Sequence, residues 1–134
     1  MNGVSGQNLL IGVGNEFRND DALGILVARE IRRRNVPGVT VVERSGEGTA
    51  LMDAWAGAEL VIVVDSIFSG KAPGVIHRLD AARDEIPRGF FHYSSHAFGV
   101  AEAVGMAREL NILPARVIIY GIEGKEFGEG VGLS

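Results

Sequence analysis

The sequence predicts an α/β domain of three layers, with helices on both faces of a mostly parallel sheet of roughly five strands. Two observations support this fold class. Short apolar segments alternate with amphipathic ones along the chain, as strands alternate with helices in such folds. Residues 60–64 are apolar without alternation, which is typical of a central strand covered on both faces. With 134 residues in total, we expect a single domain over residues 1–134.

The first strand and the first helix are predicted from the N-terminal part of the chain. Residues 8–13 form an apolar run that ends in Gly14-Asn15, as a buried strand followed by a turn would. From Asp20 onwards, apolar residues recur at helical spacing: Leu23, Leu26, Val27 and Ile31. Acids at the start and Arg32-Arg33-Arg34 at the end suit the helix dipole, so we interpret these arginines as helix stabilisation rather than as a nucleic-acid site.

A second strand, a short helix and a central strand are predicted next. Pro37-Gly38 interrupt the chain before a strand at residues 39–42. Thr49 is expected to cap a short helix that carries Leu51, Met52 and Trp55. The apolar run at residues 60–64 ends at Asp65, so this carboxylate is expected at the carboxyl end of a central strand.

The second half of the chain adds an edge strand, a helix and a last strand. Residues 75–79 alternate as an edge strand does, and the polar residues 80–87 are the least regular part of the chain. Ser94 and Ser95 precede a predicted helix at residues 96–110. Residues 116–121 predict another buried strand, and the glycine-rich residues 122–134 predict a loop.

The composition argues against several classes of protein. The chain has no cysteine and therefore no disulfide, no thiolate ligand and no cysteine nucleophile. Its net charge of −4 provides no broad basic surface for nucleic acid. No apolar run approaches the roughly 20 residues of a membrane span, and residues 1–8 lack the features of an export signal. We therefore expect a cytoplasmic protein that binds neither nucleic acid nor membrane.

Four residues with acid–base or metal-binding side chains are expected at one edge of the predicted sheet. Asp20 and Asp21 follow the first strand, Asp65 ends the central strand and His96 opens the last helix. Two carboxylates and an imidazole can hold a divalent ion with coordination positions left open, and we predict that Asp21, Asp65 and His96 do so. The alternatives are structural: the aspartates would cap a helix or a loop, and His96 would bond to Ser94 or Ser95.

Other motifs carry weaker functional signals. His92 is a reserve ligand, and His77 is predicted to be a surface residue of a strand. Gly12-Val13-Gly14 resembles the start of a dinucleotide-binding loop, but Phe17 occupies the place of the third glycine. The glycines within residues 45–49 would allow close approach of a peptide or, equally, an ordinary turn.

Three motifs follow one another along the chain: Gly12-Val13-Gly14-Asn15 with Asp20-Asp21, Val63-Val64-Asp65-Ser66, and Ser94-Ser95-His96 followed by Gly99. Ser45-Gly46-Glu47-Gly48 and Tyr120-Gly121-Ile122-Glu123 accompany them. In order and spacing, this set resembles the hydrogenase maturation endopeptidases over most of the chain.

The resemblance implies a metal-dependent endopeptidase that removes the C-terminal extension of a nickel-iron hydrogenase large-subunit precursor after nickel has been inserted. The metal-contacting positions of that family match Asp21, Asp65 and His96. Nickel would arrive bound to the precursor, which explains the lack of an H-E-x-x-H zinc helix, and another divalent ion would occupy the site in isolation. By hypothesis, Asp20 orients one of the ligands while the metal polarises the scissile carbonyl or a water.

The C-terminal part of this sequence differs from the pattern of the family. Members of the family continue past Gly-Leu-Ser into a final helix, whereas this sequence stops at Gly132-Leu133-Ser134. We therefore expect part of one sheet face to be exposed, with lower stability or pairing into a homo-oligomer as consequences.

Two other functions fit part of the pattern. A receiver-like regulatory module also has paired acids after its first strand, and Asp65 would then accept a phosphoryl group. Such a module needs a lysine at the end of its last strand, where this chain has Gly121-Ile122, and it gives His96 no role. The other alternative is a protein that docks on metal-loaded hydrogenase without cleaving it.

Overall fold

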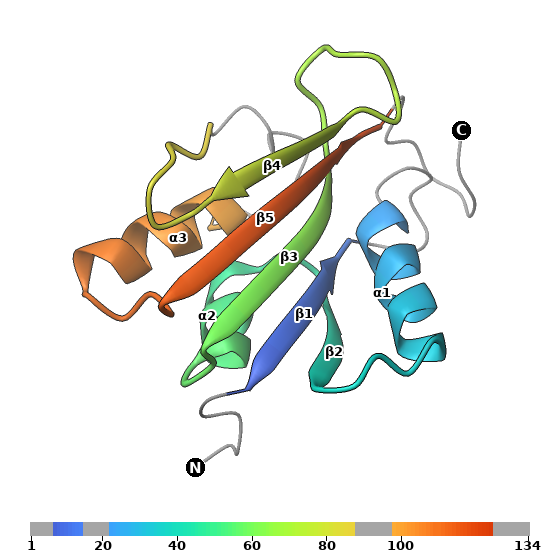
Figure 1. The fold of residues 1–134 in the computed structure, drawn as a ribbon. Coiled ribbons are helices and arrows are strands. Elements are labelled where there is room, and N and C mark those ends of the chain that lie inside the picture. Colours follow the sequence, from blue (N-terminus) through green and yellow to red (C-terminus); the bar gives the residue numbers. More distant parts are fainter. Residues whose placement is uncertain (1–6, 15–21, 88–97, 125–134) are drawn as a thin grey trace.

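The structure is a computed structural model that describes residues 7–14, 22–87 and 98–124. In chain order the elements are β1 (Asn8–Val13), α1 (Leu23–Arg33), β2 (Val39–Arg44), α2 (Gly48–Trp55), β3 (Leu60–Ile67), β4 (Ile76–Asp80), α3 (Val100–Glu109) and β5 (Arg116–Glu123) (Figure 1). The predicted fold class is confirmed, because these elements form an α/β domain around a five-stranded, mostly parallel sheet. None of the described helices is long and apolar enough to cross a membrane.

The strands lie in the order β2-β1-β3-β5-β4. The first four are parallel, and β4 runs antiparallel to β5 at one border of the sheet. The four parallel strands end at the same edge, which we call the carboxyl edge, and β4 begins there. Along the chain, β2 is added on one side of β1 and β3 on the other, so the order reverses between β1 and β3. In open α/β sheets, ligands bind in the crevice outside such a reversal point.

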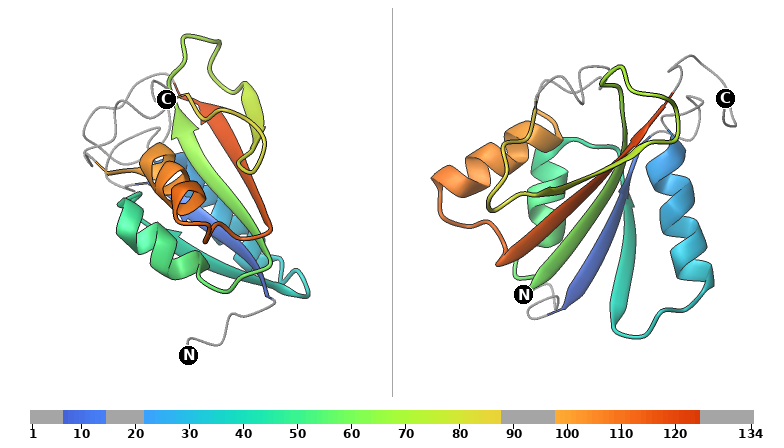
Figure 2. Two further views of the ribbon diagram at one scale, coloured as in Figure 1. Left: turned by 90° about the vertical axis from the view of Figure 1, so that its left-hand side faces the viewer. Right: turned by 45° about the horizontal axis from the view of Figure 1, so that its top comes forward.

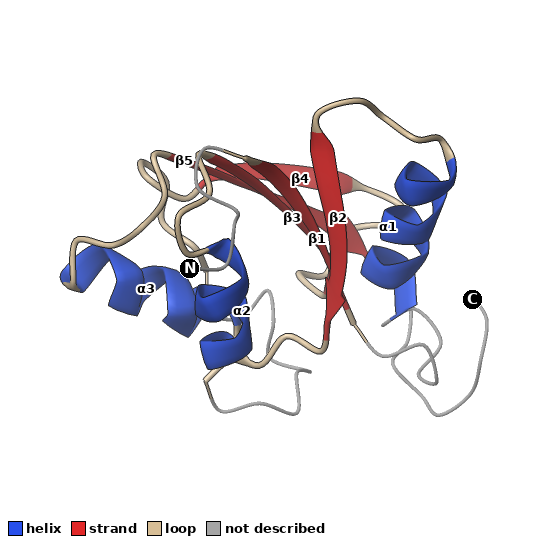
Figure 3. Cartoon of the chain, turned by 90° about the horizontal axis from the view of Figure 1, so that it is seen from below, coloured by secondary structure: helices blue, strands red, loops and turns tan. Residues whose placement is uncertain are grey.

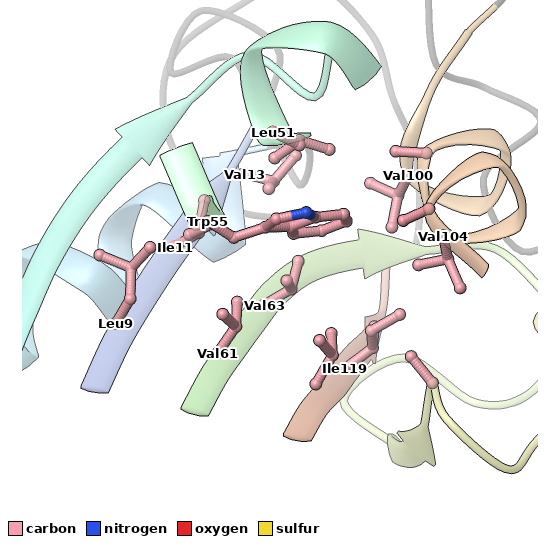
Figure 4. Close-up of a cluster of buried hydrophobic side chains, with 14 of the residues drawn as sticks. Leu9, Ile11, Val13, Leu51, Trp55, Val61, Val63, Val100, Val104 and Ile119 are labelled. Atoms are coloured by element: carbon pink, nitrogen blue, oxygen red, sulfur yellow. The ribbon is translucent and has the colours of Figure 1, made fainter. Parts of the chain in front are cut away.

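The helices form the two outer layers. Helix α1 lies on one face of the sheet, and α2 and α3 lie on the other (Figures 2 and 3). The larger buried cluster fills the space between the sheet and α2 and α3, and in Figure 4 Trp55 of α2 lies among side chains of β1, β3 and α3. The smaller cluster, on the α1 face, contains Leu10, Ala28 and Val64.

The strand ends differ from the prediction. Strand β3 continues through Asp65 to Ile67, and β5 continues past Gly121 to Glu123, because the two strands pair over their whole lengths. The prediction of a loop from residue 122 onwards was therefore wrong at its first two residues. Strand β4 is shifted by one residue from the predicted range, and β2 is two residues longer.

The helix starts differ as well. Thr49 does not cap α2: Glu47 precedes the helix, and its carboxylate accepts hydrogen bonds from the backbone N–H groups of Thr49 and Ala50. Helix α3 begins at Val100 rather than at residue 96, because Gly99 has an extended backbone and its N–H donates to the Glu102 carboxylate at 2.9 Å. The first turn of α1 contains no acidic residue.

The arginines at the end of α1 are paired within the protein. Arg32 contacts Glu43 of β2 at 2.9 Å, and Arg33 and Arg34 contact Glu30 of their own helix. Arg29 donates two further hydrogen bonds to Glu43 at 3.1 Å. These pairs support the interpretation that the arginines stabilise the helix end.

Candidate active site

Asp65 lies in β3, two residues before the strand ends at the carboxyl edge. Side chains alternate along a strand, so Asp65 lies on the same face as Val61 and Val63, the face covered by α2 and α3. The residue is only 7% exposed, and its Oδ1 accepts a hydrogen bond from the backbone N–H of Ser66 at 2.8 Å. A carboxylate this deeply buried needs bonding partners, and its place next to the reversal point is where a ligand would be found.

Helix α1 approaches the strand ends beside Asp65 very closely. Gly24 lies in its first turn, and a Cβ added there would come within 3.0 Å of the carbonyl oxygens of Val13 and Val64. Only glycine allows the helix backbone to touch the strand backbones in this way. The start of α1 is therefore held directly against the carboxyl ends of β1 and β3.

A second close approach lies on the other face of the sheet. The N–H of Gly48 donates to the carbonyl of Phe98 at 2.7 Å, and a Cβ at Gly48 would meet the Phe98 ring. This contact joins the start of α2 to the residues that lead into α3. The first turn of α1 and Phe98, two residues before α3, are thus both held at the carboxyl edge.

Of the four residues predicted to form the site, only Asp65 is among the described residues. Asp20, Asp21 and His96 lie outside them, as does the reserve ligand His92. Within ranges 7–14, 22–87 and 98–124, no group of three or more His, Asp or Glu side chains is arranged to hold a metal ion. The three-residue metal site therefore stays a prediction.

One polar cluster at the carboxyl edge was missed by the sequence analysis. Glu123, at the end of β5, is 1% exposed, and its carboxylate accepts hydrogen bonds from the Ser69 backbone N–H, at 3.1 and 3.3 Å to its two oxygens, and from the Ser69 hydroxyl. The Nε2 of His77 lies 3.1 Å from Glu123 Oε1. The prediction that His77 is a surface residue was wrong, because its side chain is only 22% exposed. The available signal was an acid directly after an apolar strand, as at Asp65.

The surroundings of Glu123 affect its titration. Burial raises the pKa of this carboxyl, but the hydrogen bonds from Ser69 and His77 lower it by more, so the pKa lies below its ordinary value. The group is therefore a buried anion at neutral pH. Because Ser69 and His77 belong to other segments, this anion joins three parts of the chain.

The mostly parallel sheet, with a buried carboxylate beside its reversal point, belongs to the class of open α/β proteins in which ligands bind at the carboxyl edge. The family profile described as hydrogenase maturation protease matches residues 25–134, and the chain belongs to this family. The resemblance found in the motifs is thereby confirmed.

Individual relatives agree with this assignment. The chain is 32% identical to the hydrogenase expression/formation protein HupD of Bradyrhizobium diazoefficiens, over 86% of this chain and 61% of that protein. It is 26% identical to the HupD of Thiocapsa roseopersicina, over 90% of this chain and 56% of the relative. The chain thus spans about three fifths of the length of these relatives. It is also 26% identical to the hydrogenase 2 maturation protease of Escherichia coli, over 94% of this chain and 78% of that protein.

Solved structures share the fold. An endopeptidase from Escherichia coli superimposes with a TM-score of 0.78 at 23% identity, and a [NiFe] hydrogenase maturation protease from Thermococcus kodakarensis with a TM-score of 0.71 at 21% identity. Both alignments cover 96% of this chain and 80% of the other.

Proposed function

We propose that this protein is an endopeptidase that removes the C-terminal extension of a nickel-iron hydrogenase large-subunit precursor after nickel insertion. The observation that carries the proposal is the family match over residues 25–134, a range that includes Asp65 and His96. The buried carboxylate of Asp65 at the carboxyl edge supports it, because this is the part of the fold where a ligand binds.

The proposed recognition site consists of Asp21, Asp65 and His96. Chain connectivity is compatible with their convergence. Asp21 lies only three residues before Gly24, and Gly24 touches the strand ends beside Asp65. His96 lies two residues before Phe98, and Phe98 contacts the start of α2. Each residue of chain spans at most about 3.8 Å, so the connecting segments are short enough to allow both side chains to reach the carboxyl edge.

The chemistry follows from the donor set. Two carboxylate oxygens and one imidazole nitrogen suit nickel, which here is part of the substrate and arrives already bound to the precursor. If the three residues complete its coordination, a precursor without nickel lacks the group that the protease recognises, and cleavage follows metal insertion. Asp20 would orient one of the three side chains by a hydrogen bond.

The test is an assay with the purified chain and a precursor prepared with and without nickel. We expect the nickel-loaded precursor alone to be shortened, and Asp65→Asn, Asp21→Ala and His96→Ala to lower the rate at least about 100-fold. Asp53→Asn, on the exposed side of α2, is the matched control and should retain the rate of the unsubstituted chain. Equal cleavage of both precursors, or a normal rate for Asp65→Asn, would contradict the proposal.

A receiver-like module is the second candidate, favoured only by the place of Asp65 near the end of a central strand. Strand β5 ends in Ile122 and Glu123 and contains no lysine to bind a phosphoryl group. Incubation with a small phosphodonor and magnesium should leave the mass of the protein unchanged under our proposal. A docking protein without peptidase activity would bind the nickel-loaded precursor and yield no shortened product.

A further inference from the structure

Glu123 forms hydrogen bonds with both ends of the β3–β4 loop, residues 68–75. Its carboxylate accepts the bonds from Ser69 at the start of the loop. Its backbone carbonyl accepts a bond from Gly74 N–H at 2.9 Å, and its N–H donates to the Val75 carbonyl at 2.8 Å, at the end of the loop. The N–H of Gly124 donates to the Ile67 carbonyl at 3.0 Å, which holds the last residue of β3 in the same place.

The β3–β4 loop is exposed and lies at the carboxyl edge. Residues 69–75 are all exposed, and Figure 1 shows the loop extending beyond the sheet at the end where β3 stops. Its first residue follows Asp65 by three positions. A polypeptide substrate whose cleaved bond lies next to Asp65 must extend past Asp65 in both directions. The β3–β4 loop is therefore in reach of the substrate residues on one side of that bond.

The burial of Glu123 indicates a positional role in addition to its contribution to stability. Removing a carboxylate from water is costly, and buried ion pairs are often no more stable than apolar residues of similar size. An apolar side chain at the end of β5 would pack against the sheet without that cost. What an apolar residue could not do is accept bonds from Ser69 and thereby hold the loop in one conformation.

We propose that Glu123 is a positioning residue that holds the β3–β4 loop in the conformation in which it contacts the polypeptide substrate. The inference rests on the proposed peptidase function. A loop already ordered in the free enzyme loses little conformational entropy when the precursor binds, whereas a loosened loop must be ordered at that moment. Loss of the carboxylate should therefore weaken binding and leave the chemical step largely unchanged.

The test compares Glu123→Gln with Glu59→Gln, an exposed glutamate at the opposite edge of the sheet. For the nickel-loaded precursor we expect Glu123→Gln to raise KM about tenfold with kcat within about twofold, because only ordering of the loop is lost. Amide hydrogen exchange in residues 69–75 should become at least about tenfold faster in the same variant. Both properties should be unchanged in Glu59→Gln.

Ser69→Ala is the second variant, because it removes only one hydrogen bond from an exposed residue and leaves the strands intact. It should raise KM about two- to fivefold. An unchanged KM despite faster exchange in the loop would overturn the inference. A lower kcat at constant KM would also overturn it, because that result indicates only that fewer molecules are folded. If Glu123→Gln does not fold, the KM of Ser69→Ala decides.

The two proposals fail in different ways. If the unsubstituted chain does not cleave the precursor, the peptidase function is refuted, and the Kd for the precursor is measured in place of KM. A Kd about tenfold higher for Glu123→Gln then supports the positioning role, and an equal Kd refutes it. If the unsubstituted chain neither cleaves nor binds the precursor, both proposals are wrong.

Discussion

Glu123 shows how a single side chain can connect distant parts of this chain. It accepts hydrogen bonds from Ser69, 54 positions away, and lies beside His77, 46 positions away. Asp65, at the same edge, accepts a bond from the adjacent residue Ser66. The long-range bonds of Glu123 exist only when β3, β4 and β5 are assembled, so its ionised form is favoured by folding.

This coupling predicts a pH-dependent contribution to stability. The pKa of Glu123 is lowered in the folded protein, so its contribution is fully present above the unfolded value of 4.5 and is lost as the pH falls through the folded value. At pH 7, Glu123→Gln should lower the free energy of unfolding by about 2 kcal/mol, the size of hydrogen bonds to a charged group. Urea unfolding at pH 7 and pH 3 should show this difference shrinking at the lower pH. A difference that stayed constant would mean that the ionised form is not the one stabilised.

Among the elements, α1 depends on the close approach of its first turn to the sheet. Gly12 of β1 also takes part, since a Cβ there would meet the Cβ of Ala28 and the carbonyl of Gly24. Helix propensity alone would favour alanine at position 24. The packing against β1 and β3 outweighs that preference, because the helix could not move outwards without exposing Ala28 and Val64.

Gly24→Ala should therefore be destabilising, by about 3 kcal/mol, as expected when extra volume is forced into a packed contact. Gly105→Ala in α3 is the matched control, because a Cβ at Gly105 meets nothing within 4 Å. That substitution should stabilise the protein by about 0.5 to 1 kcal/mol through helix propensity. Urea unfolding of both variants provides the measurement, and similar effects at the two positions would rule out close packing as the reason for glycine at position 24.

The elements also show what the sequence could predict. Helix α1 and the buried strands β1, β3 and β5 were predicted because their periodicity or apolar runs are local signals. The ends of β3 and β5 were not, because polar residues at those ends remain in the sheet through pairing between segments far apart in sequence. The cap of α2 was missed for a related reason: both Glu47 and Thr49 can cap a helix, and only the backbone geometry distinguishes them.

The candidate site was predictable in part. Topology places the carboxyl ends of parallel strands at one edge, and Asp65 does lie there. The same reasoning could have placed Glu123 at this edge, but not its contacts with Ser69 and His77, because the antiparallel pairing that brings β4 next to β5 is not encoded in any local pattern. Convergence of Asp21 and His96 with Asp65 remains a prediction.

At the scale of the whole molecule, the two sides of the sheet differ in how much they bury. The face toward α2 and α3 carries the larger cluster, which includes Trp55 (Figure 4). On the other face, α1 is the one helix that covers the sheet within the part of the chain that the structure describes. Ile76 of β4 is 62% exposed. Most of the hydrophobic stabilisation should therefore come from the α2 and α3 side.

Neighbouring residues of β3 allow this asymmetry to be measured with one type of substitution. Val63 points into the larger cluster and Val64 into the smaller one. Truncation to alanine removes the same two methyl groups at each position. The cavity left by Val63 lies within the larger cluster of buried residues, whereas the side chains around Val64 are mostly only partly buried and can move to fill the space. We expect Val63→Ala to lower the free energy of unfolding by about 3 kcal/mol and Val64→Ala by about 1.5 kcal/mol, measured by urea unfolding at pH 7. Equal costs would show that α1 packs on the sheet as tightly as α2 and α3 do, and the exposure of Ile76 would then be confined to the border strand.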